Sequence, residues 1–256
     1  MAAVGKMILG RLLKADLEHL KAELRNESSR LKAEHQQQLE TTAAADDRLR
    51  KEVVRWANPI LNAVNDLDYR LRNILELEGY VALDPATASS DPQWSMTYDY
   101  FLDSTLYLFA QYFCQIHLLR QELSFEVFGT HEKKVAFAEP ILAVEKSIGD
   151  YSASFKFDGT GNDRQVFRFR QRAIGELLTN PVAKAPSCIA FPTYLIKKAD
   201  SQFVAAFDPL QKFVDKLKPG ERRWARLLCT CEALGELRSE CEKLLSLKHA
   251  STDVVV

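Results

Sequence analysis

WSMTYDYFLDSTLYLFAQYFCQIHLLRQELSFEVF, residues 94–128, is the stretch of the chain that decides the fold. It holds ten of the chain's 25 aromatic residues. A helix that is apolar over most of its circumference must be enclosed by neighbours on most sides. The pattern therefore predicts a buried central helix over residues 95–128. Stepping 100° per residue around that helix gathers these apolar residues on one broad face: Tyr98, Phe101, Leu102, Phe109, Tyr112, Phe113, Ile116, Leu119, Leu123 and Val127.

A membrane-spanning helix is the alternative explanation of the same apolar residues. The longest window without Asp, Glu, Lys or Arg is 16 residues, from Ser104 to Leu119, and it contains two glutamines and a histidine. A spanning helix needs about 20 mostly apolar residues, and ionisable groups at membrane depth are costly. The sequence favours a helix buried in protein, and we expect no transmembrane segment.

Four further segments have the periodicity of helices that pack on the central one: 48–78, 131–149, 163–179 and 221–247. The first is the most regular, because its apolar residues recur at spacings of four and three: Val53, Ala57, Ile60, Val64, Leu67, Leu71 and Ile74. The predicted fold is all-α, a multi-helix bundle over residues 46–248.

Two stretches are less definite. Residues 151–169 leave two alternatives, either a β-hairpin or a loop followed by a helix that Asp163 caps. Residues 249–256 are expected to form a flexible tail.

The N-terminal 45 residues differ in composition from the bundle. Residues 7–40 are rich in Lys, Glu and Gln, and their apolar seam is thin. Two good heptads fall short of the three or four that indicate a coiled coil, because Glu27 and Glu34 occupy later seam positions. Residues 1–45 are predicted to form a helical, coiled-coil-like interaction arm. Its seam consists of Leu13, Leu17, Leu20, Leu24 and Leu31.

Composition limits the class of partner and the compartment. The net charge is −1 and the isoelectric point about 6.5, which makes a nucleic-acid partner unlikely. Five cysteines, an odd number, without a secretory signal favour the cytoplasm or another reducing compartment. The start of the chain, MAAVGKMILGRLLK, is basic and partly apolar. It allows peripheral membrane contact as an alternative.

No motif in the chain specifies a reaction. His131-Glu132-Lys133-Lys134-Val135 lacks the second histidine of a zinc-protease helix, and DGTGND at 158–163 fits neither calcium-loop pattern. The sequence also has no phosphate loop, dinucleotide fingerprint or nucleophile elbow. We expect no metal, no cofactor and no enzymatic activity.

The polar residues that are candidates for a functional site lie on the central helix and on the helix predicted over residues 163–179. Arg170 falls in the middle of the apolar face of its predicted helix, where an unpaired charge is costly. We hypothesise that it pairs with Asp103 or Asp99, and that a small polar pocket lies beside His117 and Gln121. Asp103 and His117 are separated by about 21 Å along a helix, so they cannot share one catalytic centre.

Three arginines, Arg164, Arg168 and Arg172, line the opposite face of the helix predicted over 163–179. They offer an anion-binding face. Such a stripe is more often a solvated surface or a partner for acids within the fold.

Together these observations predict a non-enzymatic interaction or scaffold protein. It would self-associate, or bind a protein partner, through its N-terminal helix. The alternatives are a helical protein that holds a small apolar or acidic ligand in its bundle, and a peripheral membrane protein.

Overall fold

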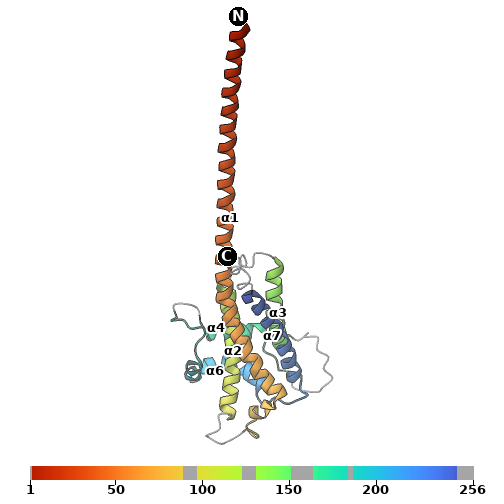
Figure 1. Ribbon diagram of the computed structural model, residues 1–256. Coiled ribbons are helices and arrows are strands. Elements are labelled where there is room, and N and C mark those ends of the chain that lie inside the picture. The colour runs from red at the N-terminus through yellow and green to blue at the C-terminus, as the bar shows by residue number, and fades with distance from the viewer. Residues whose placement is uncertain (1, 89–96, 123–130, 151–163, 184–186, 247–256) are drawn as a thin grey trace. The chain divides into compact units, whose positions relative to one another are not determined.

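The computed structural model describes residues 2–88, 97–122, 131–150, 164–183 and 187–246, with the side chains of 2–17, 45–46, 48–50, 52–54, 122 and 131–134 left aside. Within these ranges the chain is helical and has no strand, which confirms the all-α prediction (Figure 1). The elements in order are α1 (Ala2–Glu76), the 3-10 helix η1 (Gly79–Leu83), α2 (Tyr98–Glu122), α3 (His131–Gly149), α4 (Arg168–Leu177), α5 (Phe191–Lys197), α6 (Ser201–Val214) and α7 (Arg222–Ser246).

α1 is one helix from Ala2 to Glu76. Residues 41–47 are helical, and Pro59 lies inside the helix. A proline in a helix interior removes one backbone hydrogen bond and costs about 3 kcal/mol. The burial of Trp56, Ala57, Ile60 and Val64 around Pro59 offsets that cost. By internal contacts the chain forms two units, Met1–Lys51 and Glu52–Val256, which are described separately below.

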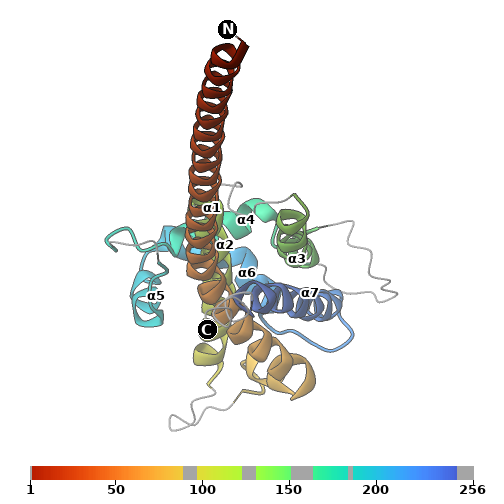
Figure 2. The same cartoon turned by 45° about the horizontal axis from the view of Figure 1, so that its top comes forward.

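In the second unit, α2 is enclosed along most of its length. Every residue from Phe101 to Leu106 is buried, and so are Phe109, Tyr112 and Ile116 further along. The helices α4, α5 and α6 and the 3-10 helix η1 pack against α2, while α3 packs against α7 (Figure 2). Residues 95–96 and 123–128 of the predicted central helix lie outside the described part of the chain.

The contact between α2 and α4 depends on a glycine. A Cβ atom on Gly175 would lie 2.5 Å from the carbonyl oxygen of Phe113, closer than non-bonded atoms can approach. Only a residue without a side chain lets the backbone of α4 lie directly on that of α2. This crossing brings the first turns of α4 close to the C-terminal half of α2.

α4 begins later than predicted. Its first residue is Arg168, and residues 164–167 are not helical; the predicted cap Asp163 lies outside the described residues. The Val166 amide donates a hydrogen bond to the Ile148 carbonyl at the end of α3, at 3.2 Å, which holds this segment out of the helix. The buried stripe of the helix is therefore Gln171, Ile174, Gly175 and Leu178. Phe167 and Leu177 are exposed, although both are apolar.

Two buried arginines on α7 hold the C-terminal ends of two other helices. Arg226 has no solvent-exposed surface and donates hydrogen bonds to the carbonyls of Ser147 and Asp150, both at 3.0 Å. One turn earlier, Arg223 donates to four carbonyls at the end of α6 and just beyond it, those of Lys212, Phe213, Asp215 and Lys216. The last carbonyls of a helix lack partners within the helix, and a cation there also complements the helix dipole.

Replacing Arg226 by Met should destabilise the protein strongly. Methionine keeps much of the side-chain volume but removes the donors, so that buried carbonyls at the end of α3 lose their partner. Each hydrogen bond from a charged group contributes about 1.5–3 kcal/mol. We expect the free energy of unfolding to fall by about 3–5 kcal/mol in urea titrations followed by circular dichroism.

The matched control is Arg168→Met, which changes an exposed arginine. It should shift the free energy of unfolding by no more than about 0.5 kcal/mol. Equal losses in the two variants would show that the Arg226 hydrogen bonds do not stabilise α3.

Candidate functional site

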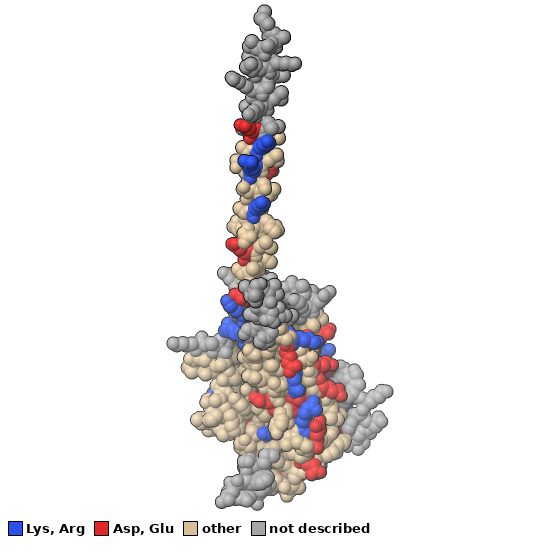
Figure 3. Space-filling model, viewed as in Figure 1, with Lys and Arg blue, Asp and Glu red and all other residues tan. Residues whose placement is uncertain are grey.

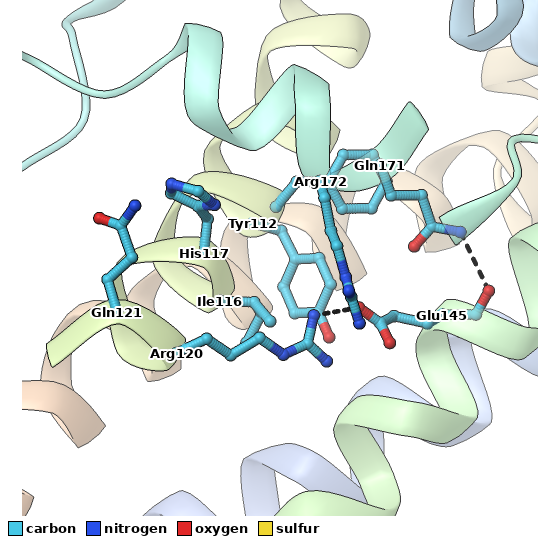
Figure 4. Close-up of a pocket in the computed structure, with 9 residues that line it drawn as sticks. Tyr112, Ile116, His117, Arg120, Gln121, Glu145, Gln171 and Arg172 are labelled. Atoms are coloured by element: carbon cyan, nitrogen blue, oxygen red, sulfur yellow. Dashed lines mark hydrogen bonds and ion pairs between the residues drawn. The ribbon is translucent and has the colours of Figure 1, made fainter. Parts of the chain in front are cut away.

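A cavity of about 270 Å³ lies in the second unit, between α2, α3 and α4. It has an apolar side from α2 and a polar side to which all three helices contribute (Figure 4). Nine residues line it: Tyr112, Phe113, Ile116, His117, Arg120, Gln121, Glu145, Gln171 and Arg172.

An ion pair between α2 and α3 crosses the cavity. Arg120 Nη1 donates to Glu145 Oε1 at 2.5 Å, and the Glu145 side chain is 4% exposed against 36% for Arg120. A buried carboxylate is costly unless a cation and hydrogen bonds compensate it. Here the cation compensates only one of the two carboxylate oxygens.

Gln171 connects α4 to α3. Its Nε2 donates to the backbone carbonyl of Glu145 at 3.0 Å and to that of Val166 at 2.7 Å. Both amide hydrogens are therefore used within the fold. The side chain is fixed, and its carbonyl oxygen accepts no hydrogen bond from a described residue.

Three buried polar atoms of the lining have no hydrogen-bond partner in the described part of the chain: Tyr112 Oη, Glu145 Oε2 and Gln171 Oε1. Each belongs to a residue at most 3% exposed. Buried polar groups in native proteins are nearly always hydrogen-bonded, to protein or to something else. Each of the three atoms has less than 1 Å² of accessible surface, so the contents of the cavity cannot reach them.

The phenol of Tyr112 is held in its protonated form. Burial raises the pKa of Tyr112 well above its ordinary value, and the negative charge of Glu145 raises this pKa further, against the opposing charge of Arg120. The buried hydroxyl therefore keeps both its donor and its acceptor capacity.

The structure brings together only part of the pocket expected from the sequence. His117 and Gln121 line the cavity, whereas Asp99, Asp103 and Arg170 do not. Asp103 is nine-tenths buried and pairs with Lys198 at 2.5 Å. Arg170 is exposed. The hypothesis of an ion pair between Arg170 and Asp103 or Asp99 is therefore wrong, because the later start of α4 turns Arg170 toward solvent.

The arginine stripe is also not a single helical face. Arg164 precedes α4, so only Arg168 and Arg172 lie on the helix, and all three are exposed. Arg172 alone lines the cavity. In Figure 4 it extends from α4 toward the Arg120–Glu145 pair.

Sequence reasoning missed four of the polar lining residues, Tyr112, Arg120, Glu145 and Gln171. Tyr112 was counted as core because its ring fits the apolar face. Arg120 did carry a signal, because it is the single basic residue between positions 81 and 130. Glu145 and Gln171 carried none, because each is an ordinary polar residue on an amphipathic helix.

A second surface lies on the first unit. All residues from Glu18 to Ala44 are exposed, and the seam leucines Leu20, Leu24 and Leu31 are 57–59% exposed. The side chains of Leu13 and Leu17, at the start of the same seam, lie outside the described residues.

Metal sites and reactive cysteines are two further kinds of site to consider for the described residues. No group of three His, Cys, Asp or Glu side chains there is placed to hold a metal ion. All five cysteines are free, and burial raises the pKa of Cys231 and of Cys241 to about 12. Such thiols stay protonated and are poor nucleophiles at neutral pH.

Comparisons with known proteins give no relative from which a role for the cavity could be inferred. No family model matches the chain, and comparisons with curated proteins and with solved structures find no match.

The buried phenol of Tyr112 makes stability depend on alkaline pH. An unfolded tyrosine loses its proton near pH 10, whereas folded Tyr112 retains it because its pKa is raised. Above pH 10 the folded state therefore binds one more proton, and the free energy of unfolding falls by about 1.4 kcal/mol per pH unit from this residue. Urea titrations between about pH 8 and 11 should show a shallower decline for Tyr112→Phe than for the wild-type chain.

Tyr69→Phe is the control, since Tyr69 is exposed on α1. This variant should keep the wild-type slope. A Tyr112→Phe slope equal to that of the wild type would mean that the phenol ionises as readily in the folded protein as in the unfolded chain.

Proposed function

We propose that the protein is a non-enzymatic helical scaffold that self-associates through the N-terminal part of α1. The observation that supports this proposal is the exposure of residues 18–44 on every side, with three seam leucines more than half exposed. Such a helix needs a partner to remain folded. Most helical stability in proteins comes from packing of an apolar face, and isolated helices are marginal in water.

Contacts within residues 18–51 are too weak to replace that packing. They include i,i+4 pairs such as Arg30–Glu34 at 3.1 Å and Lys51–Asp47 at 2.6 Å. Pairs of this kind on an exposed helix contribute only about 0.3–0.5 kcal/mol each.

A second copy of the chain is the partner that best fits the seam. The spacing from Leu20 to Leu24 and then to Leu31 is uneven, because Glu27 occupies the position between the last two leucines. An identical helix lying parallel and in register places a leucine opposite each leucine. Residues 18–44 carry five acidic and four basic side chains, so net charge opposes this pairing only weakly.

Both signs of charge are also interspersed on the face of the molecule shown in Figure 3, among the residues coloured there. A nucleic-acid partner would call for a continuous basic surface instead. No described helix has the length and apolar character to cross a membrane. Peripheral membrane contact through the basic N-terminus stays a prediction.

The expected association is weak. Burying the exposed half of one leucine contributes about 1 kcal/mol, so six leucines in a pair contribute roughly 6 kcal/mol. The loss of rotational and translational freedom costs at least about 4 kcal/mol. These two terms leave about 2 kcal/mol, too little for association below millimolar concentration. Leu13 and Leu17 extend the seam in the sequence, and these four further leucines of a pair would add about 4 kcal/mol. We therefore expect a dimer or higher multiple with a dissociation constant of tens of micromolar, on the order of that total of about 6 kcal/mol.

The test is sedimentation velocity of the full chain with two charges added to the seam, Leu24→Lys together with Leu31→Lys. The wild-type chain should associate as its concentration rises from about 1 to about 200 µM. The seam variant should sediment as a monomer over the same range, because two lysines would face their own copies in the pair.

The matched control adds the same two charges on the other side of the helix. Ala22 and Ala33 lie about 180° from the seam, and Ala22→Lys with Ala33→Lys should associate like the wild type. A wild-type chain that remains monomeric throughout, or two double variants that behave alike, would contradict self-association through this seam.

A further inference from the structure

We propose that Cys114 and Cys188 are a peroxide-sensitive thiol pair, in which Cys188 is oxidised first and Cys114 then closes a disulfide between α2 and the segment that follows α4. The pair is independent of the association proposed for the N-terminal helix, because all five cysteines lie in the second unit. Three features support this reaction: the contacts that place the two sulfurs together, their difference in exposure, and the polar groups around them.

Backbone contacts hold Cys188 beside the end of α4. Thr179 and Cys188 face each other in an isolated antiparallel β-bridge. Two backbone hydrogen bonds, at 2.8 and 2.9 Å, flank this bridge. Residues directly opposite each other in an antiparallel pair have Cβ atoms about 4.5–5.5 Å apart. The position of Cys188 is therefore determined by that of Thr179.

Cys114, on α2, lies against the same bridge. Its sulfur is 3.9 Å from the hydroxyl oxygen of Thr179. The Cys188 sulfur in turn lies 3.9 Å from the carbonyl oxygen of Gln111, about one turn before Cys114 on α2. Each thiol therefore contacts the element that carries the other, and a hydrogen bond joins the two thiols. Two sulfurs in such contact can be linked by rotation of their side chains.

The two thiols differ in their access to solvent. Cys188 is partly exposed, whereas Cys114 has no exposed surface. A small oxidant such as hydrogen peroxide can therefore reach Cys188, and Cys114 is placed to react with the product. An accessible cysteine beside a second, resolving cysteine is the common arrangement of a redox-sensitive site.

The surroundings favour the loss of one proton from the pair. Hydrogen bonds from the Cys188 thiol and the Thr179 hydroxyl lower the pKa of Cys114, against the opposing effect of burial. After that loss the remaining proton is shared between the two sulfurs, and the Gln115 side-chain amide donates to Cys188 at 3.3 Å. Negative charge can therefore also reside on the partly exposed sulfur. The thiolate is the form that reacts with peroxide.

Hydrogen peroxide is the only oxidant that the reaction needs. The Cys188 thiolate attacks one peroxide oxygen and the O–O bond breaks, which gives a sulfenic acid and a hydroxide that takes up the proton released by the pair. The Cys114 sulfur then attacks the Cys188 sulfur, the S–O bond breaks, and the hydroxyl leaves as water with the Cys114 proton. Two thiols lose two electrons and two protons, and the peroxide becomes two waters. A low-molecular-weight thiol would reverse the disulfide by exchange.

A pair of inert core thiols is the competing explanation, because a free cysteine commonly behaves as a small hydrophobic residue. The two alternatives differ in their response to peroxide. An inert pair stays unlinked. The proposed pair forms one specific link, between Cys114 and Cys188, in preference to any other among the five cysteines.

The experiment is limited oxidation of the dilute, reduced full chain with hydrogen peroxide, followed by alkylation, trypsin digestion and mass spectrometry. Cys114 lies in the tryptic peptide 73–120 and Cys188 in the peptide 185–197. We expect a disulfide to join these two peptides in most of the oxidised chains and dithiothreitol to separate them again. On non-reducing electrophoresis the oxidised chain should remain a monomer.

The link should also stabilise the fold. It closes the loop 114–188, and a closed loop restricts the unfolded chain more than the folded one. The thermal unfolding midpoint should therefore rise by about 5 °C or more on oxidation and return to its first value after reduction.

Three variants separate the roles of the cysteines. Cys188→Ser should lose the link and the rise in midpoint, because it removes the thiol that meets the peroxide. Cys114→Ala should stop the reaction at the sulfenic acid of Cys188, which dimedone labels on peptide 185–197. Cys229→Ser is the matched control, since Cys229 is also partly exposed and lies on α7. This variant should behave like the wild type.

Every result bears on the pair. Linked peptides in the wild type and in Cys229→Ser, together with their absence in Cys188→Ser, would support it. Unlinked peptides after peroxide treatment, a disulfide between two copies of the chain, or equal oxidation of Cys188 and Cys229 would overturn it. The wild-type digest decides by itself even if the Cys114→Ala chain fails to fold, because it requires no variant.

Discussion

The buried guanidinium of Arg226 is the constraint on which the arrangement of α3 depends. Its two hydrogen bonds fix the last turn of α3 against α7, and a hydroxyl pair between Ser147 and Thr230, at 2.8 Å, lies beside them. With its C-terminal end held in this way, α3 has a defined rotation about its axis. Ser147 therefore faces α7, while Glu145, two residues earlier, faces the cavity and Arg120.

The polar contacts among the three helices of the cavity follow from that rotation. Arg120 of α2 pairs with the Glu145 side chain, and Gln171 of α4 donates to the Glu145 backbone. One residue of α3 thus makes contact with both neighbouring helices. Interior polar networks stabilise a fold when every member is satisfied and destabilise it when some are not. Three atoms of this network have no partner among the described residues, so the network is not fully satisfied.

The sequence predicted the elements better than the contacts between them. α3 begins and ends where periodicity placed it, and α7 differs from its prediction by one residue at each end. Burial of α2 followed from its unusually broad apolar face. These features depend on local composition and on the helical period, and both can be determined from the sequence without knowing which helices pack against each other.

The errors arose where the outcome depended on distant residues. Asp103 needed a cation, as expected, but Lys198 supplied it from just beyond α5, and nothing near either residue in the sequence indicates the other. The assignment of Arg170 to an apolar face failed because a backbone hydrogen bond from Val166 to Ile148 delays the start of α4. A shift of a few residues in a helix start changes which side chains are buried, so a site built on that helix cannot be predicted from the sequence of the helix alone.

The two segments of α1 have different sources of stability. From Trp56 to Ile74 the spacing of four and three gives a continuous buried stripe, so packing within the chain stabilises the helix. Between Glu18 and Ala44 the leucines are too sparse to form such a stripe, and every side chain is exposed. The many Glu, Lys, Gln and Ala residues of this segment have high helical propensity and favour the helical conformation. The association proposed for this segment would supply the burial that it lacks within the chain, and that proposal rests on the exposure of the helix more than on the strength of its heptad pattern.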